Sequence, residues 1–291
     1  MSKICILILA HKNYNQTMRL INHLKKDFDL FVHIDKKSAL KIDSFENVKV
    51  YKKFKVYYED ITMVIATLFL MEEAIKNNYD RYILISAQDM PLLSNKNIVK
   101  FFNDNKDNEY INFCNVKDNE YINFCNVKEN KNTTLYNTTL YRFTKYHFRG
   151  RIRKLINNKI LDFITGLKFL QRRIPDNLYS GSQWWNLTKN AVSYILNYIK
   201  ENPNYKKIFN HTLVSDEYFF QTILLNSPIK TNIINNNHRY IIFDDFSSHP
   251  RTFTINDYDN FIRGGVNLFA RKFDEKIDND IIDKLYKKIE N

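Results

Sequence analysis

The segment Ile4-Cys5-Ile6-Leu7-Ile8-Leu9-Ala10 is an unbroken run of apolar residues. It is far shorter than the roughly 20 residues that a membrane-spanning helix requires. A run without polar alternation is typical of a strand that is buried on both faces of a parallel sheet. Similar runs lie at 30–34 and 81–86. The three runs therefore predict three buried strands.

Helical patterns separate these strands. Residues 13–26 and about 60–77 carry apolar residues at helical spacing, and residues 278–290 predict a last helix. Strands that alternate with helices form a parallel sheet with helices on its faces. We therefore expect a single α/β domain with a Rossmann-type, mostly parallel central sheet flanked by helices.

Polar residues follow each predicted strand. They lie in Ala10-His11-Lys12, in His33-Ile34-Asp35-Lys36 and in Ser86-Ala87-Gln88-Asp89-Met90-Pro91. Open α/β sheets bind ligands at the carboxyl ends of their strands. His11, Asp35 and Asp89 are therefore candidate ligand contacts, with a turn or a helix cap as the alternative role for Asp89.

The chain of 291 residues carries an excess of cations. Its 44 Lys and Arg against 32 Asp and Glu give a net charge of +12. Such a charge favours an anionic partner, which leaves nucleic acid, a phospholipid surface and a small phosphorylated substrate as alternatives. Cys5, Cys114 and Cys125 have no metal-binding spacing and imply no disulfide framework. We expect a reducing, cytoplasmic environment and a protein that is not secreted.

Two segments between 106 and 173 are unusual. Residues 106–116 recur unchanged as 117–127, and 132–136 recur as 137–141. Two copies are too few for a solenoid, so we expect one copy to form a strand and the other an extra loop or edge strand. Residues 142–173 are strongly basic; a solvated face, an anionic membrane or acceptor, and nucleic acid remain as alternatives there.

Several common enzyme motifs are absent from the sequence. The first predicted strand runs into Ala10-His11-Lys12-Asn13 without glycine, which argues against a dinucleotide fold and a P-loop. Asp27-Phe28-Asp29 and Asp257-Tyr258-Asp259 have the Asp-x-Asp letters of a metal site in unfavourable places. Asp244-Asp245 is better placed but equally suits a turn. The sequence therefore predicts no metal site.

Acidic and basic groups in the last third of the chain suggest a transfer reaction. Asp216 and Glu217 open the helix-forming run Val214-Ser215-Asp216-Glu217-Tyr218-Phe219-Phe220. Arg251 and Lys272 follow as fixed cations. Deprotonation of a hydroxyl while an anionic leaving group departs requires a base and such cations. Alternatively, Glu217 stabilises a helix start, and the two cations pair with neighbouring carboxylates.

The segment Gly181-Ser182-Gln183-Trp184-Trp185 holds both tryptophans of the chain. An exposed indole would offer a platform on which a sugar ring stacks. The alternative is that both indoles belong to the core.

These segments, in this order, resemble the core-2/I-branching family of β-1,6-N-acetylglucosaminyltransferases, which includes the peptide O-xylosyltransferases. The resemblance covers roughly residues 4 to 274. Besides the segments quoted above, it rests on Leu9-Ala10-His11-Lys12, Val32-His33-Ile34-Asp35-Lys36-Lys37-Ser38, Ser215-Asp216-Glu217-Tyr218-Phe219, His249-Pro250-Arg251 and Leu268-Phe269-Ala270-Arg271-Lys272-Phe273-Asp274.

The resemblance implies a GT-A-like fold and an inverting reaction that needs no divalent metal and no cofactor. It implies that Glu217 is the base and that the diphosphate of a UDP-sugar is neutralised by basic residues of the carboxyl-terminal part. The implied contacts are Arg251, Lys272, His11, Asp35 and Tyr58 for UDP, and Asp89, Ser182, Trp184 and Asp216 for the donor or acceptor sugar.

We therefore expect a glycosyltransferase domain at 1–275, with a nucleotide-binding half at 1–105, an acceptor and catalytic half at 106–275, and a C-terminal helix within 276–291. The expected donor is UDP-GlcNAc, with UDP-xylose as the alternative, and the acceptor is a glycan or lipid-linked glycan of a bacterial surface. Peripheral contact with an anionic membrane is compatible with the charge, and no nucleic-acid partner is expected. The alternative from another class is a non-catalytic glycan- or anion-binding module.

Overall fold

The computed structural model describes residues 2–116, 141–143, 146–147, 172, 175–244, 247, 249–263 and 266–290. Its central sheet has seven strands in the order β10-β6-β9-β4-β1-β2-β3. The strands are β1 (Ile4–Ala10), β2 (Asp29–Ile34), β3 (Val48–Tyr51), β4 (Arg81–Ser86), β6 (Glu109–Ile111), β9 (Trp185–Thr188) and β10 (Ile233–Ile234).

Most neighbouring strands of the sheet are parallel, and β10 pairs in parallel with β6. β1 pairs in parallel with β2 on one side and with β4 on the other, and β2 pairs in parallel with β3. β9 runs antiparallel to both β4 and β6. The predicted fold class, a GT-A-like α/β domain with a mostly parallel central sheet, is confirmed by this arrangement. β3 was not predicted, because it has only four residues with mixed burial and forms no continuous apolar run.

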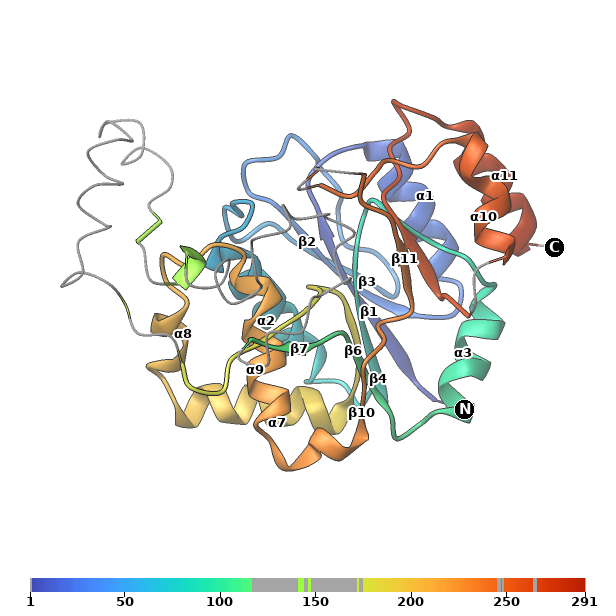
Figure 1. Cartoon of the computed structure of the whole chain (residues 1–291). Helices are drawn as coiled ribbons and strands as arrows, with labels where there is room; N and C mark the ends of the chain where they lie inside the picture. Colours follow the sequence, from blue (N-terminus) through green and yellow to red (C-terminus); the bar gives the residue numbers. More distant parts are fainter. Residues whose placement is uncertain are drawn as a thin grey trace, which may run out of the picture.

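Helices cover both faces of the sheet (Figure 1). One face carries α2 (Ile61–Ala74), α7 (Lys189–Glu201) and α9 (Phe219–Leu225), and the other carries α1 (Tyr14–Leu24) and α3 (Asn95–Asp104). The C-terminal helix α11 (Asp280–Glu290) lies beside α1. The three helices predicted from spacing are therefore confirmed as α1, α2 and α11.

Smaller elements complete the described fold. A three-stranded sheet has the order β11 (Arg239–Ile241), β12 (Phe269–Arg271), β5 (Asp89–Pro91), and β7 (Cys114–Asn115) pairs with β8 (Tyr179–Ser180). Short helices are α8 (Tyr205–Ile208), η3 (Ser215–Glu217), η4 (Pro228–Asn232), η5 (Ile255–Asp257) and α10 (Tyr258–Arg263). The first tandem copy supplies β6 and β7. The second copy and most of the basic region 142–173 lie outside the described residues.

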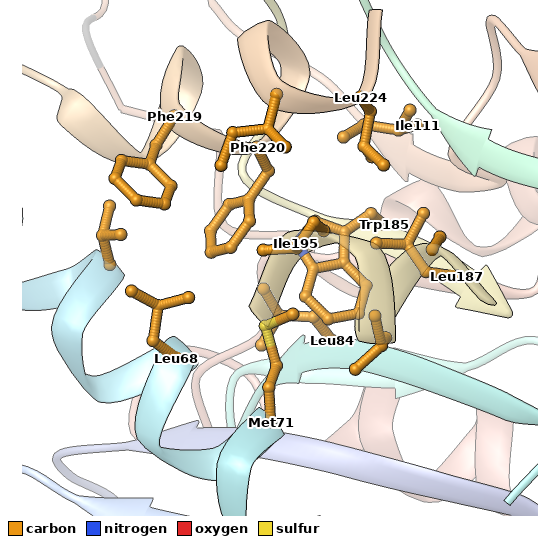
Figure 2. Packing of buried hydrophobic residues seen from close by; sticks show 14 of the residues in the cluster. Leu68, Met71, Leu84, Ile111, Trp185, Leu187, Ile195, Phe219, Phe220 and Leu224 are labelled. Atoms are coloured by element: carbon orange, nitrogen blue, oxygen red, sulfur yellow. The ribbon is translucent and has the colours of Figure 1, made fainter. Parts of the chain in front are cut away.

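The largest hydrophobic cluster joins α2, α7 and α9 to the sheet. Figure 2 shows Phe219 and Phe220 facing Leu68, with Trp185 of β9 between Phe220 and the sheet. The Trp185 and Phe220 rings lie 5.8 Å apart in an edge-to-face arrangement, which is a favourable geometry for aromatic pairs. This packing fixes the start of α9, and with it the preceding turn η3. Within the described part of the chain, no helix is both long and apolar enough to cross a bilayer.

Candidate active site

The carboxyl ends of β4, β1 and β2 lie side by side, because the three strands are parallel neighbours. His11 and Asp35 follow two of these ends, and the Asp35 amide donates to the Ala10 carbonyl oxygen at 2.9 Å. Asp35 also accepts a hydrogen bond from the Val56 amide at 3.1 Å. Asp35 therefore positions the loop that leads to Tyr58.

Positive charge gathers around His11. Burial lowers the pKa of His11, and Lys12, Arg271 and Lys272 lower it further, whereas Asp35 raises it. A charge acts on a neighbour's pKa chiefly over short distances. The structure thus brings Asp35 and Lys272 within electrostatic reach of His11. Their roles at a UDP site, which the resemblance implies, stay predictions.

Arg251 and Lys272 lie on adjacent chain segments. The Lys272 amide donates to the Arg251 carbonyl oxygen at 3.4 Å, and the Phe253 amide donates to the Lys272 carbonyl oxygen at 2.8 Å. The Arg251 guanidinium donates to Asp257 at 2.7 Å. Arg251 therefore adjoins Lys272 and pairs with a neighbouring carboxylate. Its contact with a diphosphate stays a prediction.

Arg271 connects the cation group to the sheet. Its Nη1 donates to Oδ1 of Asp89 at 2.8 Å, and the Asp89 side chain is 0% exposed. Its guanidinium carbon lies 4.6 Å from the centre of the Trp184 ring. Stacking on an aromatic face and pairing with a carboxylate hold a guanidinium in one orientation. Trp184 and Asp89 are thus both buried against Arg271.

Lys12 and the residue after it anchor the other end of the Lys272 segment. The Asp274 carboxylate accepts from Lys12 Nζ at 2.7 Å and from Asn13 Nδ2 at 2.7 Å. The amide of Gln16 donates to the Phe273 carbonyl oxygen at 3.1 Å. These polar contacts therefore join the residues after β1 to the segment that follows Arg271 and Lys272.

Glu217 lies at the end of η3 and is held through its backbone. The Gly181 amide donates to the Glu217 carbonyl oxygen at 2.8 Å, and the Val214 amide donates to the Glu59 carbonyl oxygen at 2.8 Å. Val214 adopts the left-handed conformation with φ 49°. The Glu217 side chain is 31% exposed, so it remains accessible to a small substrate.

The acidic pair has unusual electrostatics. Burial raises the pKa of Glu217, the Arg142 guanidinium lowers it, and Glu59 raises it. Burial and the Glu217 charge raise the pKa of Asp216 to about 7. Oδ1 of Asp216 is buried and has no hydrogen-bond partner among the residues that the structure describes. The Asp216 side chain is 6% exposed, so its ionised form is costly. Glu217, in contrast, has Arg142 as a counter-ion.

Tyr58 links the acidic pair to the cations. Partial burial raises the pKa of Tyr58 to about 12, together with Glu59, Glu217 and Asp216, and Arg271 lowers it. The Tyr58 ring also lies 5.2 Å from the His249 ring, centre to centre. The Glu217 carboxylate and the Arg271 guanidinium therefore both act on the Tyr58 phenol.

The other sequence candidates have these positions. Both tryptophans are buried, at 5% and 0% exposure for Trp184 and Trp185. The core alternative is thus confirmed for both indoles, because Trp185 fills the hydrophobic cluster and Trp184 lies against Arg271. Ser182 accepts at its carbonyl oxygen from Gln221 at 2.7 Å. The sugar-binding roles of Asp89, Ser182, Trp184 and Asp216 stay predictions.

The Asp-x-Asp triplets have structural partners. Asp27 accepts from Asn95 at 2.8 Å, Asp29 accepts from Tyr79 at 2.7 Å, and Asp257 caps η5 while it binds Arg251. Among the residues that the structure describes, no three His, Cys, Asp or Glu side chains come close enough to hold a metal ion. Metal independence stays a prediction.

Two site residues were missed by the sequence reasoning. No role was predicted for Arg271. A single arginine in the apolar strand Leu268-Phe269-Ala270-Arg271 was nevertheless a signal for a buried partner. Arg142 was included in the basic run. Its contact with Glu217, at 3.6 Å, joins segments distant in the sequence and had no local signal.

Comparison with known proteins adds a second line of evidence. The family model described as "Core-2/I-Branching enzyme" matches residues 6–261. Xylosyltransferase 1 of Mus musculus is 23% identical over 95% of this chain and 29% of its own length. Xylosyltransferase 2 of Rattus norvegicus is 22% identical over 97% of this chain and 33% of its own length. The chain thus spans about a third of the length of these relatives.

A solved structure is similar over much of the chain. It is assigned to a glucose-1-phosphate thymidylyltransferase from Bacillus anthracis, with a TM-score of 0.34 and 13% identity. The match covers 84% of this chain and 87% of that one.

Proposed function

The chain belongs to the Core-2/I-Branching enzyme family, and from this premise we propose that it transfers GlcNAc from UDP-GlcNAc to a hydroxyl of a glycan acceptor. Membership makes it a glycosyltransferase. The observation that best supports the proposal is the position of Tyr58. The Glu217 carboxylate raises the pKa of its phenol, and the Arg271 guanidinium lowers it. We propose that the base and the cationic leaving-group site lie on either side of one reaction centre near this phenol.

The chemistry is a direct displacement at the anomeric carbon of the donor. Glu217 takes the proton of the acceptor hydroxyl, whose oxygen forms the new bond to C1. The bond between C1 and the phosphate oxygen breaks, its electron pair leaves with UDP, and the configuration at C1 inverts. A positioned base contributes about 10²- to 10⁴-fold to the rate of such a step.

Arg251 and Lys272 are proposed to neutralise the diphosphate as it leaves. Fixed cations that need no rearrangement stabilise developing charge most effectively where water is excluded. Lys272 suits this role because burial and the charges of Arg271 and Lys12 lower its pKa, and an added dianion would relieve that repulsion. His11, Asp35 and Tyr58 are proposed to line the nucleotide site, and no divalent metal is required.

A UDP-xylose donor is the second candidate. It is favoured by the names of the relatives, which are xylosyltransferases of animals. The acceptor that we propose is a glycan or lipid-linked glycan, in the synthesis of a bacterial surface polysaccharide. The Lys-rich, cysteine-poor composition supports an intracellular site of action.

A donor screen tests the proposal. Thermal shift and UDP release are measured with UDP-GlcNAc, UDP-xylose, UDP-galactose and UDP-glucose, in EDTA, with water as the acceptor. We expect UDP-GlcNAc to give the largest shift and the fastest release. A larger response to UDP-xylose would replace the donor. Binding of a UDP-sugar without release above the uncatalysed rate would favour a non-catalytic binding module, and no response to any donor would contradict the proposed function.

A further inference from the structure

Arg142 is anchored beside the proposed base. Its Nη1 donates to the Tyr218 hydroxyl at 3.0 Å and lies 3.6 Å from Oε2 of Glu217. Its carbonyl oxygen accepts from the Leu213 amide at 3.4 Å. The next residue, Phe143, is 1% exposed and packs edge-on against Tyr218 at 5.0 Å between ring centres. The guanidinium is therefore held from the backbone, the hydroxyl and the core.

In the part of the chain that the structure describes, acidic and basic groups both lie near Glu217. Asp216 adjoins it on η3, Glu59 faces it from the loop before α2, and Tyr58 of the same loop lies within electrostatic reach. Arg271 acts on Tyr58 from β12, and Arg142 faces Glu217 from residues 141–143. Of these groups, Arg142 forms an ion pair with Glu217.

We propose that Arg142 is a positioning residue that keeps Glu217 ionised and oriented as the catalytic base, beside a neighbour, Asp216, that retains its proton. This inference rests on the proposed role of Glu217. It assigns opposite states to two adjacent carboxyl groups. The pair then carries one negative charge, and that charge resides on the group that Arg142 contacts.

The physical reason is the different surroundings of the two acids. Asp216 is buried, and within the described part of the chain one of its oxygens has no hydrogen-bond partner, so its neutral form is favoured. Glu217 is partly exposed and lies next to the guanidinium, which favours its charged form. Without Arg142, burial and Glu59 would raise the pKa of Glu217 further, and its proton would be lost only at higher pH. A base that is protonated at working pH is inactive.

Carboxyl NMR tests the inference without any assay of activity. The side-chain carboxyl carbons of Glu are labelled with ¹³C, and the Glu217 signal is assigned by its loss in Glu217→Gln. We compare the wild type with Arg142→Met and Arg142→Lys. The matched control is Arg172→Met, because Arg172 donates to the Thr212 hydroxyl at 3.1 Å and lies over the Tyr146 ring.

The expected result is a rise of about one pH unit or more in the Glu217 midpoint in Arg142→Met, with Arg142→Lys closer to the wild type and Arg172→Met unchanged. The acid limb of the pH profile of UDP release should move by the same amount, which lowers the rate about tenfold at any pH well below the limb. A purely structural role would lower the whole profile without moving the limb.

The inference and the proposed function can fail separately. An unchanged Glu217 midpoint in folded Arg142→Met overturns the role of Arg142, whatever the activity. If the midpoint moves but Glu217→Gln retains full UDP release, Arg142 still sets the ionisation of Glu217, and the proposed base is wrong. Thermal melts confirm that each variant is folded; if Arg142→Met does not fold, Arg142→Gln takes its place in the titration.

Discussion

Asp89 of β5 and Arg271 of β12 face each other on two neighbouring short strands. Their contact joins the end of β4 to the segment that carries Lys272. They are direct partners in the antiparallel register of β5 and β12, and their side chains form an ion pair at 2.8 Å in which the Asp89 side chain is 0% exposed. Asp89 follows the buried strand β4, whereas Arg271 precedes Lys272. The ion pair thus fixes the position of Lys272 relative to the strand ends.

A double-mutant cycle measures the contribution of this pair. Arg271→Met leaves a buried carboxylate without its counter-ion, and such a loss costs about 3–5 kcal/mol. Asp89→Asn alone should also destabilise the protein. The double variant should lose less stability than the sum of the two single variants, as measured by urea unfolding. Additive losses would show that the two side chains do not interact.

Removal of a proposed diphosphate contact should weaken the binding of UDP. Arg251→Gln and Lys272→Met each delete a charge-assisted contact of about 1.5–3 kcal/mol, so we expect Kd to rise about 10- to 100-fold in calorimetry. Lys76→Met is the control, because Lys76 is exposed and pairs with Glu73. Unchanged UDP affinity in both site variants would remove Arg251 and Lys272 from the diphosphate site.

Asp216 should make the stability of the protein depend on pH. Its pKa is raised by burial and by Glu217 to about 7, from about 3.9 in an unfolded chain. A raised pKa gives stability that is present below the unfolded value and is lost as pH rises through the folded value. The stability of Asp216→Asn relative to the wild type should therefore increase between about pH 4 and pH 7. Above about pH 7 this difference in stability should stay constant.

Thermal melts of Asp216→Asn and the wild type at pH 5 and pH 8 check this expectation. Each kcal/mol corresponds to about 2–4 °C in Tm for a domain of roughly this size. The difference in Tm between the variant and the wild type should be larger at pH 8. The same difference at both values would mean that Asp216 titrates normally.

Gly181 should not tolerate a side chain. A Cβ at this position would lie 1.8 Å from the Asn112 carbonyl oxygen, and backbone atoms cannot move away as a flexible side chain can. Gly181→Ala should lose about 1–3 kcal/mol of stability and lower UDP release further, because the Gly181 amide holds the Glu217 backbone. Ser182→Ala is the neighbouring control for stability. Wild-type Tm in Gly181→Ala would contradict the close approach.

The sequence predicted the elements whose pattern is local and continuous. The apolar runs of β1, β2 and β4 and the helical spacing of α1, α2 and α11 needed no partner to be recognised. Their parallel order then implied that His11 and Asp35 would lie at one edge. The antiparallel strand β9 was harder to predict, since Trp185 could equally belong to a surface platform.

The contacts that define the site were less predictable because they join distant segments. Arg142 and Glu217 are separated by the basic region, and no periodicity connects them. The sequence left open whether Trp184 is buried or exposed, and its contact with Arg271 became visible only in the fold. Local residue types therefore predicted the chemistry of the site, whereas the pairing of each charged group required the fold.

The most direct test of the account compares UDP release from UDP-GlcNAc and UDP-xylose by the wild type and by Glu217→Gln, in EDTA. The account predicts turnover by the wild type, a loss of about 10²- to 10⁴-fold in Glu217→Gln, and UDP affinity that is nearly the same in both. Full turnover by Glu217→Gln, or a wild type that works only with added Mn²⁺, would contradict it.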